Sequence, residues 1–143
     1  MRYLGISLVC IFGFLTSAQA QEAKPNFSGK WQLNTSKSQT PTGKASVSSL
    51  AIEHKDPSIH IVKTTSAGKT QEFTCTTKGS DCDAKAYKAS LWYDAKSLVE
   101  MDVSDDQVLK ISMSLSDDGK TLTAEVTYLS PHAEKDTLVF DKN

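Results

Sequence analysis

Beyond its first twenty residues, the chain is a series of short runs in which apolar and polar residues alternate, with turn signals between the runs. In residues 108–116 and 121–129 an apolar side chain recurs at every second position, which is the period of a β-strand with one buried face. Between these two runs, Asp117-Asp118-Gly119-Lys120 carries the Asp-Gly signal of a tight hairpin. The pattern predicts about nine strands, at residues 27–34, 47–54, 58–65, 70–75, 87–93, 98–103, 108–116, 121–129 and 136–140.

Short strands at this regular spacing are typical of an all-β sandwich or barrel. Because the turns join sequential neighbours, the simplest topology is antiparallel and up-and-down. An open sheet of this size would leave two exposed edges, and pairing the first strand with the last removes them. We therefore expect an antiparallel up-and-down β-barrel of about eight to ten strands, without a substantial helix after residue 20. A sandwich is the alternative, less favoured because the two cysteines lie close together in sequence.

Residues 1–20 have the composition of a secretory signal peptide. Arg2 precedes an apolar stretch over residues 3–15, and Ser17-Ala18-Gln19-Ala20 ends in the small-x-small pattern that signal peptidases recognise. The apolar stretch is too short to span a bilayer, which takes about 20 residues. We therefore expect one domain over residues 21–143, no transmembrane segment in it, and export to the periplasm or the extracellular space.

The charge pattern excludes some classes of partner. The formal net charge is -1, and lysines and acidic residues are interspersed without a basic block. This distribution argues against nucleic acid or an anionic membrane as a partner. Arg2 is the sole arginine, so the predicted mature chain has no guanidinium group to clamp a phosphate or carboxylate.

Two cysteines, Cys75 and Cys82, remain after the predicted signal peptide. An even count in an exported protein indicates a disulfide. The short segment between them carries turn residues, so we expect the bridge to pin one hairpin. A zinc site would need further ligands, and no C-x-x-C redox motif is present.

The first predicted strand is introduced by Asn26-Phe27-Ser28-Gly29-Lys30-Trp31. This segment resembles the Gly-x-Trp signature that begins the barrel in lipocalins, fatty-acid-binding proteins and other calycins. More closely, it resembles the opening of a group of small exported bacterial lipocalin-like proteins, which share an Asp-Pro turn like Asp56-Pro57 and a similar Asp-Gly hairpin. The resemblance covers most of the mature chain and implies a calycin-like barrel with Gly29 and Trp31 as a structural motif.

Lipocalins usually pair this tryptophan with an arginine from the last strand, which this chain does not have. Lys135 or Lys142 is the expected substitute, placed over the indole in a cation–π contact.

No motif indicates catalysis, so we expect neither an enzyme nor a cofactor. Glu100 and Asp102 share one face of a predicted strand; they could serve as acid and base in a cavity, but a solvated outer face is the simpler expectation. His54, Asp56 and His60 lie near one turn without the tight spacing of a metal site, so no metal is expected.

Two functions remain. The calycin resemblance implies an exported binding protein that holds a small apolar ligand inside the barrel. The alternative is an envelope or secreted protein-interaction module, such as an inhibitor or accessory protein, with a filled barrel. The interior decides between them, because large side chains can fill a small barrel completely. The residues expected to contact a ligand are Phe73, Leu91, Tyr93, Ile111, Met113 and Tyr128.

Overall fold

The computed structural model describes residues 22–143, so the predicted signal peptide, residues 1–20, lies outside the described residues. The described part forms strands, turns and loops, and it contains no helix that could cross a membrane. Its strands are β1 (Gly29–Leu33), β2 (Val47–Lys55), β3 (Ser58–Thr65), β4 (Thr70–Thr76), β5 (Lys78–Asp83), β6 (Lys88–Asp94), β7 (Ser97–Val103), β8 (Val108–Leu115), β9 (Thr121–Ser130) and β10 (Glu134–Lys142).

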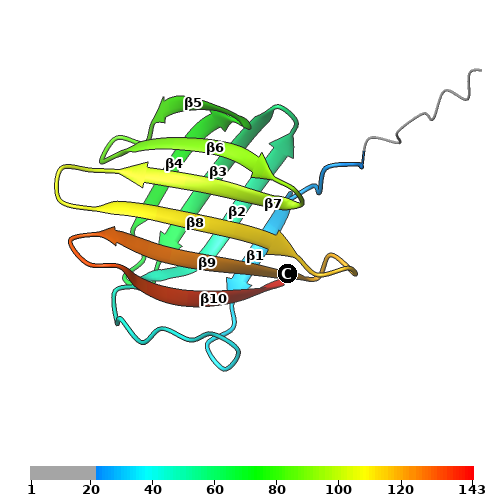
Figure 1. Ribbon diagram of the computed structural model, residues 1–143. Coiled ribbons are helices and arrows are strands. Elements are labelled where there is room, and N and C mark those ends of the chain that lie inside the picture. Colours follow the sequence, from blue (N-terminus) through cyan, green and yellow to red (C-terminus); the bar gives the residue numbers. More distant parts are fainter. Residues whose placement is uncertain (1–21) are drawn as a thin grey trace, which may run out of the picture.

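All ten strands belong to one antiparallel sheet with the order β4-β3-β2-β1-β10-β9-β8-β7-β6-β5. Figure 1 shows β6–β10 as a front layer that crosses over β1–β4 behind it. The predicted antiparallel barrel is therefore confirmed, and so is the predicted pairing of the first strand with the last. The two edges of the sheet, β4 and β5, are consecutive in sequence, so the barrel is nearly closed.

Strand β5 was not predicted, because its sequence lacks an apolar period. Its residues are polar or glycine apart from Cys82, and nearly all of its side chains are exposed. It pairs with β6 through a shifted register between Lys78 and Asp81. Hydrogen bonding to a neighbour, rather than burial, thus makes this segment a strand, and that determinant leaves no period-2 signal in the sequence.

The predicted disulfide is present, but its structural role differs from the expected one. Cys75 and Cys82, whose Cα atoms lie 5.5 Å apart, join β4 to β5. Because these strands are the two ends of the sheet, the bridge links its edges instead of pinning a hydrogen-bonded hairpin. A covalent link therefore lies where the ladder of hydrogen bonds is interrupted.

The chain segment before β1 closes one end of the barrel. Phe27 and Trp31 are fully buried there, and the Trp31 indole Nε1 donates to the Phe27 carbonyl oxygen at 3.1 Å. Lys142 Nζ lies 5.2 Å from the centroid of the Trp31 ring, so of the two lysines proposed for this contact Lys142 makes it. Gly29 permits this arrangement, because a Cβ at Gly29 would lie 2.8 Å from Lys142 Cε.

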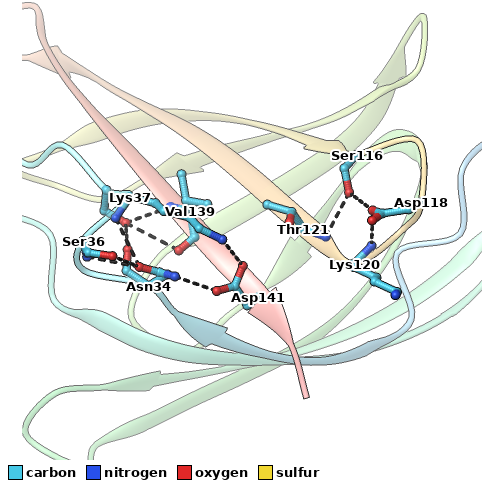
Figure 2. A network of polar contacts seen from close by, with 10 residues as sticks. Asn34, Ser36, Lys37, Ser116, Asp118, Lys120, Thr121, Val139 and Asp141 are labelled. Atoms are coloured by element: carbon cyan, nitrogen blue, oxygen red, sulfur yellow. Dashed lines mark hydrogen bonds and ion pairs between the residues drawn. The ribbon is translucent and has the colours of Figure 1, made fainter.

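The loop after β1 is held to β10 by polar contacts (Figure 2). Asn34 Nδ2 donates to Asp141 Oδ2 at 2.6 Å, and Lys37 Nζ lies 3.0 Å from Asp141 Oδ1. Figure 2 also shows the β8–β9 hairpin, in which Ser116 Oγ and the backbone N–H of Lys120 both donate to Asp118 Oδ1. The predicted Asp-Gly turn is thus confirmed, with Gly119 at a φ of 67°.

We predict that replacing both Cys75 and Cys82 by alanine lowers the free energy of unfolding by about 2 kcal/mol without preventing folding, because the closed loop is short and the hydrogen-bonded ladders remain. Urea unfolding of the oxidised protein and of the double variant measures the difference. The reduced wild-type protein serves as a control and should show the same loss. A double variant that does not fold, or that is as stable as the oxidised protein, would contradict this prediction.

Candidate functional site

The barrel contains a cavity of about 410 Å³ at the end opposite Trp31. Its rim is formed by residues 44–47 before and at the start of β2, by Ala86 and Tyr87 before β6, and by residues between Ser104 and Gln107 in the β7–β8 turn. That turn and the β9–β10 turn lie at the left of Figure 1. The barrel is therefore closed at one end and hollow at the other.

The part of the cavity wall formed by β8, β9 and β10 is apolar, whereas Lys63, Gln71 and Asp102 are among the polar residues elsewhere in its lining. Leu109 and Ile111 from β8, Val126 from β9 and Leu138 from β10 line it. A second space of about 50 Å³, with Met113, Ala124 and Phe140 in its lining, lies deeper in the barrel. Both spaces are lined by Val47, Lys63, Ile111, Val126 and Leu138, so the deeper space shares the walls of the larger one.

Three charged side chains meet inside the barrel. Lys63 Nζ on β3 lies 2.5 Å from Glu100 Oε1 and 3.3 Å from Asp102 Oδ2, both on β7. Glu100 is 1 % exposed and Asp102 is 6 % exposed. The expectation that these carboxylates occupy a solvated outer face is therefore wrong: Leu98, Glu100 and Asp102 face inward, and the intervening Val99 and Met101 face the other way.

Burial and charge shift the pKa values of this cluster. Burial raises the pKa of Asp102 to about 8, and repulsion from Glu100 adds to the effect while Lys63 opposes it. Burial alone would lower the pKa of Lys63, but attraction to Glu100 and Asp102 outweighs burial and the pKa lies above its ordinary value. Burial also raises the pKa of Tyr87 to about 12. At neutral pH Lys63 is therefore charged, and Asp102 is largely protonated.

Two oxygens of this cluster have no hydrogen-bond partner among residues 22–143: Asp102 Oδ1 and Tyr87 Oη. Both residues line the large cavity. Buried polar atoms are nearly always paired in folded proteins, since leaving one unpaired costs about 1–3 kcal/mol. The two oxygens are themselves buried, but they belong to side chains that line the cavity, so a ligand seated against these side chains could supply the missing partner.

The six residues predicted to contact a ligand fall into two groups. Ile111 and Tyr128 line the large cavity, and Met113 lines the deeper space. Phe73 and Leu91 are buried in the core without lining either space, and Tyr93 lies at the closed end, where its hydroxyl is 3.1 Å from His54 Nε2. The structure thus brings Ile111, Met113 and Tyr128 together around the cavity and places the other three elsewhere.

The histidines noted in the sequence have structural partners. His54 Nδ1 accepts a hydrogen bond from the backbone N–H of Phe27 at 3.3 Å, so its Nε2 carries the proton and faces Tyr93. Burial lowers the pKa of His54, which is consistent with a neutral ring. His60 bonds the Thr74 hydroxyl. Within the described residues no group of three or more His, Cys, Asp or Glu side chains could hold a metal ion.

Comparison with known proteins agrees with this architecture. No protein-family model and no curated protein matches the sequence. Among solved structures, a Schistosoma mansoni fatty acid binding protein in complex with arachidonic acid matches with a TM-score of 0.64 and 14 % identity, over 82 % of this chain and 96 % of that one.

Two further structures match comparably. The fluorescent protein UnaG gives a TM-score of 0.63 at 15 % identity, over 82 % of this chain and 97 % of its own. Fatty-acid-binding protein 1 of Echinococcus granulosus gives 0.62 at 14 % identity, over 81 % of this chain and 96 % of its own. The chain therefore has the calycin-like barrel fold of the fatty-acid-binding proteins.

Lys63 was absent from the residues predicted to form a site, and Glu100 and Asp102 were assigned to the wrong face. A signal for Lys63 was present in the parity of its strand, whereas β7 has apolar residues at both parities. Lys63 continues the inward series of Ile59 and Ile61 on β3, and Glu100 and Asp102 continue that of Leu98 on β7. A charged residue at a strand position whose side chain points into the barrel indicates a buried polar site.

We predict that the free energy of unfolding falls as the pH rises from 7 to 8. In this range Asp102 holds a proton in the folded protein and has lost it in the unfolded chain. Raising the pH therefore favours the unfolded state, and the free energy of unfolding falls by at most about 1.4 kcal/mol per pH unit. Urea unfolding at pH 7, 8 and 9 measures the slope.

Asp102→Asn should abolish this slope and be more stable than the wild-type protein at pH 9, since it removes the charge that burial disfavours. Glu125→Gln, which removes a carboxylate from an exposed position on β9, is the matched control and should keep the slope. Equal slopes in the wild-type protein and Asp102→Asn would refute the assignment.

Proposed function

We propose that this chain is a binding protein that holds one small, largely apolar ligand in the barrel cavity. The observation that supports this most directly is the cavity of about 410 Å³, hollow at one end of the barrel and walled by aliphatic side chains of β8, β9 and β10. Its volume lies within the range of about 300–1,000 Å³ that is usual for small-molecule sites. Burying apolar ligand surface there is favourable by about 25 cal/mol per Å².

The similar solved structures support the same proposal at the level of fold. One of them is a fatty acid binding protein with arachidonic acid bound, and another is also a fatty-acid-binding protein. A shared fold alone does not define a ligand, because one fold hosts many functions. The cavity of this chain is the independent argument.

The interior also favours ligand binding over the alternative of a surface-interaction module with a filled barrel. That alternative depends on core side chains that occupy the whole interior, whereas here the core packs the closed end and leaves the other end hollow. The large hydrophobic side chains exposed on the described residues are Val103 and Leu129, which do not amount to a broad apolar patch.

We further propose that the chain acts by binding and not as an enzyme. Both lysines that line the cavity are held in ion pairs, Lys63 with Glu100 and Asp102 and Lys44 with Glu134, and neither cysteine of the disulfide offers a free thiol. The Ser104 hydroxyl lies 3.0 Å from the Asp106 carboxylate at the cavity rim, but its Oγ is also 3.2 Å from the Gln107 carbonyl oxygen, so we assign this contact to the β7–β8 turn and not to catalysis.

We predict that the protein binds the uncharged apolar dye N-phenyl-1-naphthylamine with an increase in fluorescence, and that Ile111→Trp weakens this binding at least tenfold. The new indole would occupy space between the two parts of the cavity, since Ile111 lines both. Ser114→Trp is the matched control: it lies on the same strand, β8, at an exposed position, and should bind the dye like the wild-type protein. Absence of dye binding, or equal binding by all three proteins, would contradict a cavity binder.

We also propose that the protein is exported and acts in the periplasm or outside the cell. The signal-like composition of residues 1–20 and the disulfide between Cys75 and Cys82 support this, because disulfides persist in oxidising compartments. N-terminal sequencing of the protein isolated from its own host should give a chain that begins at Gln21. A chain that retains residues 1–20 would contradict export by this route.

A further inference from the structure

We infer that the ligand carries one ammonium group on an apolar body, and that Asp102 Oδ1 and Tyr87 Oη receive that group at the inner wall of the cavity. This inference rests on the proposed binding function and specifies the class of ligand. It concerns a molecule without a carboxylate or phosphate, such as a long-chain primary amine.

The first argument is the balance of charge. In this cluster two carboxylates, Glu100 and Asp102, face a single ammonium, that of Lys63, while the other buried carboxylate, Asp136, is bound by Thr42 and Tyr128. With all three groups ionised the cluster has one negative charge in excess. A buried charge is strongly disfavoured unless it is paired, so the cluster requires one more positive charge or one proton.

The second argument is the pair of unsatisfied atoms. Asp102 is 6 % exposed, and its Oδ2 accepts from Lys63 while its Oδ1 has no partner within residues 22–143. Tyr87 Oη is also unpartnered there, and both residues line the cavity. An ammonium group has three N–H donors and no acceptor, so it can donate to both oxygens.

The third argument excludes an anionic head group. A carboxylate ligand would need a cation, and both lysines that line the cavity are already paired: Lys63 with Glu100 and Asp102, and Lys44 with Glu134. The chain has no arginine after Arg2. A carboxylate ligand would also be repelled by Asp102 once Asp102 is ionised, or would require Asp102 to keep its proton. The acid bound in the Schistosoma mansoni structure therefore does not define the head group that suits this barrel.

The surroundings of Asp102 fit the same inference. The charged and titratable groups that face it are Lys63 from β3, Glu100 from its own strand, and Tyr87 from the segment before β6. The neighbours that pair with it across the sheet, Ala89 on β6 and Leu109 on β8, are apolar. The raised pKa of Asp102 means that a proton supplies the missing positive charge in the empty barrel, and an ammonium ligand would replace that proton.

The apolar part of the ligand has a defined position in the cavity. Leu109, Ile111 and Val126 continue the cavity wall from Asp102 toward the interior, where the deeper apolar space begins. The ligand would thus lie with its alkyl part along β8 and β9 and its ammonium group against β7. Its polar end is recognised by hydrogen bonds to buried groups, which discriminate more strongly than the apolar walls do.

The test compares three ligands that differ only in the head group: decylamine, 1-decanol and sodium decanoate, titrated into the unaltered protein at pH 8 by isothermal titration calorimetry. We expect decylamine to bind at least tenfold more tightly than decanoate, with decanol between them. If decanoate binds as tightly as decylamine or more tightly, the inference is overturned while the proposed binding function stands. If none of the three binds, the proposed function fails together with it.

Variants locate the head group. Asp102→Asn keeps the size of the side chain and removes its charge, so it should weaken decylamine binding at least tenfold and leave decanol binding within twofold. Tyr87→Phe should weaken decylamine binding about threefold. The control Glu125→Gln removes an exposed carboxylate from β9 and should bind all three ligands like the wild-type protein. Unchanged decylamine binding by Asp102→Asn would overturn the assignment of the site.

The pH dependence gives a readout that simple hydrophobic binding does not produce. Alkylammonium ions keep their proton up to about pH 10, whereas Asp102 must lose its own proton before it can bind an ammonium ion. Decylamine affinity should therefore rise about tenfold per pH unit below pH 8 and level off above it, and Asp102→Asn should show no such rise. A wild-type affinity that is constant from pH 6 to 9 contradicts the exchange of the proton for the ligand.

Discussion

The short ladder between β1 and β10 is the constraint on which the rest of this structure depends. Every other ladder joins strands that follow each other in sequence, and β4 and β5 are the two edges of the sheet. The first four strands and the last six would otherwise form two separate meanders. The register Trp31↔Lys142 and Leu33↔Phe140 joins them into one curved sheet and fixes how the two layers face each other.

Several features of the sequence support this ladder. Gly29 leaves room for Lys142 to lie over the Trp31 indole, and Asn34 and Lys37 both hold Asp141. These contacts lie at the closed end and along its margin, where Phe27 is fully buried. The packing of large side chains is therefore concentrated at one end of the barrel, and this concentration is what leaves the other end hollow.

The same closure creates the polar cluster. Lys63 on β3 reaches Glu100 and Asp102 on β7 only because the sheet curls these two strands toward each other. Replacing such a cluster with apolar residues is often neutral or stabilising, so its presence inside a small barrel is more readily explained by recognition than by stability. The unpaired oxygens of Asp102 and Tyr87, two residues that line the cavity, are consistent with that explanation.

The sequence by itself determined most of the fold. Three of its signals are local: the alternation along β8 and β9, the Asp117-Asp118-Gly119 turn and the Gly29–Trp31 pair. Such signals can be interpreted without knowledge of the rest of the fold, because they require only that one face of a strand is buried. It also determined the pairing of Cys75 with Cys82, and three of the residues around the cavity, Ile111, Met113 and Tyr128.

Only the tertiary structure decided the features that depend on contacts between distant parts of the chain and on closure of the barrel. The polar strand β5 exists because β6 offers it hydrogen bonds, and the disulfide joins sheet edges because closure brings β4 and β5 together. The inward face of Glu100 and Asp102 could not be chosen from β7 alone, since Leu98, Val99 and Met101 place apolar residues on both faces. A charged side chain is stable inside a barrel only if its counterion arrives from another strand, and Lys63 lies 37 residues away from Glu100 in the chain.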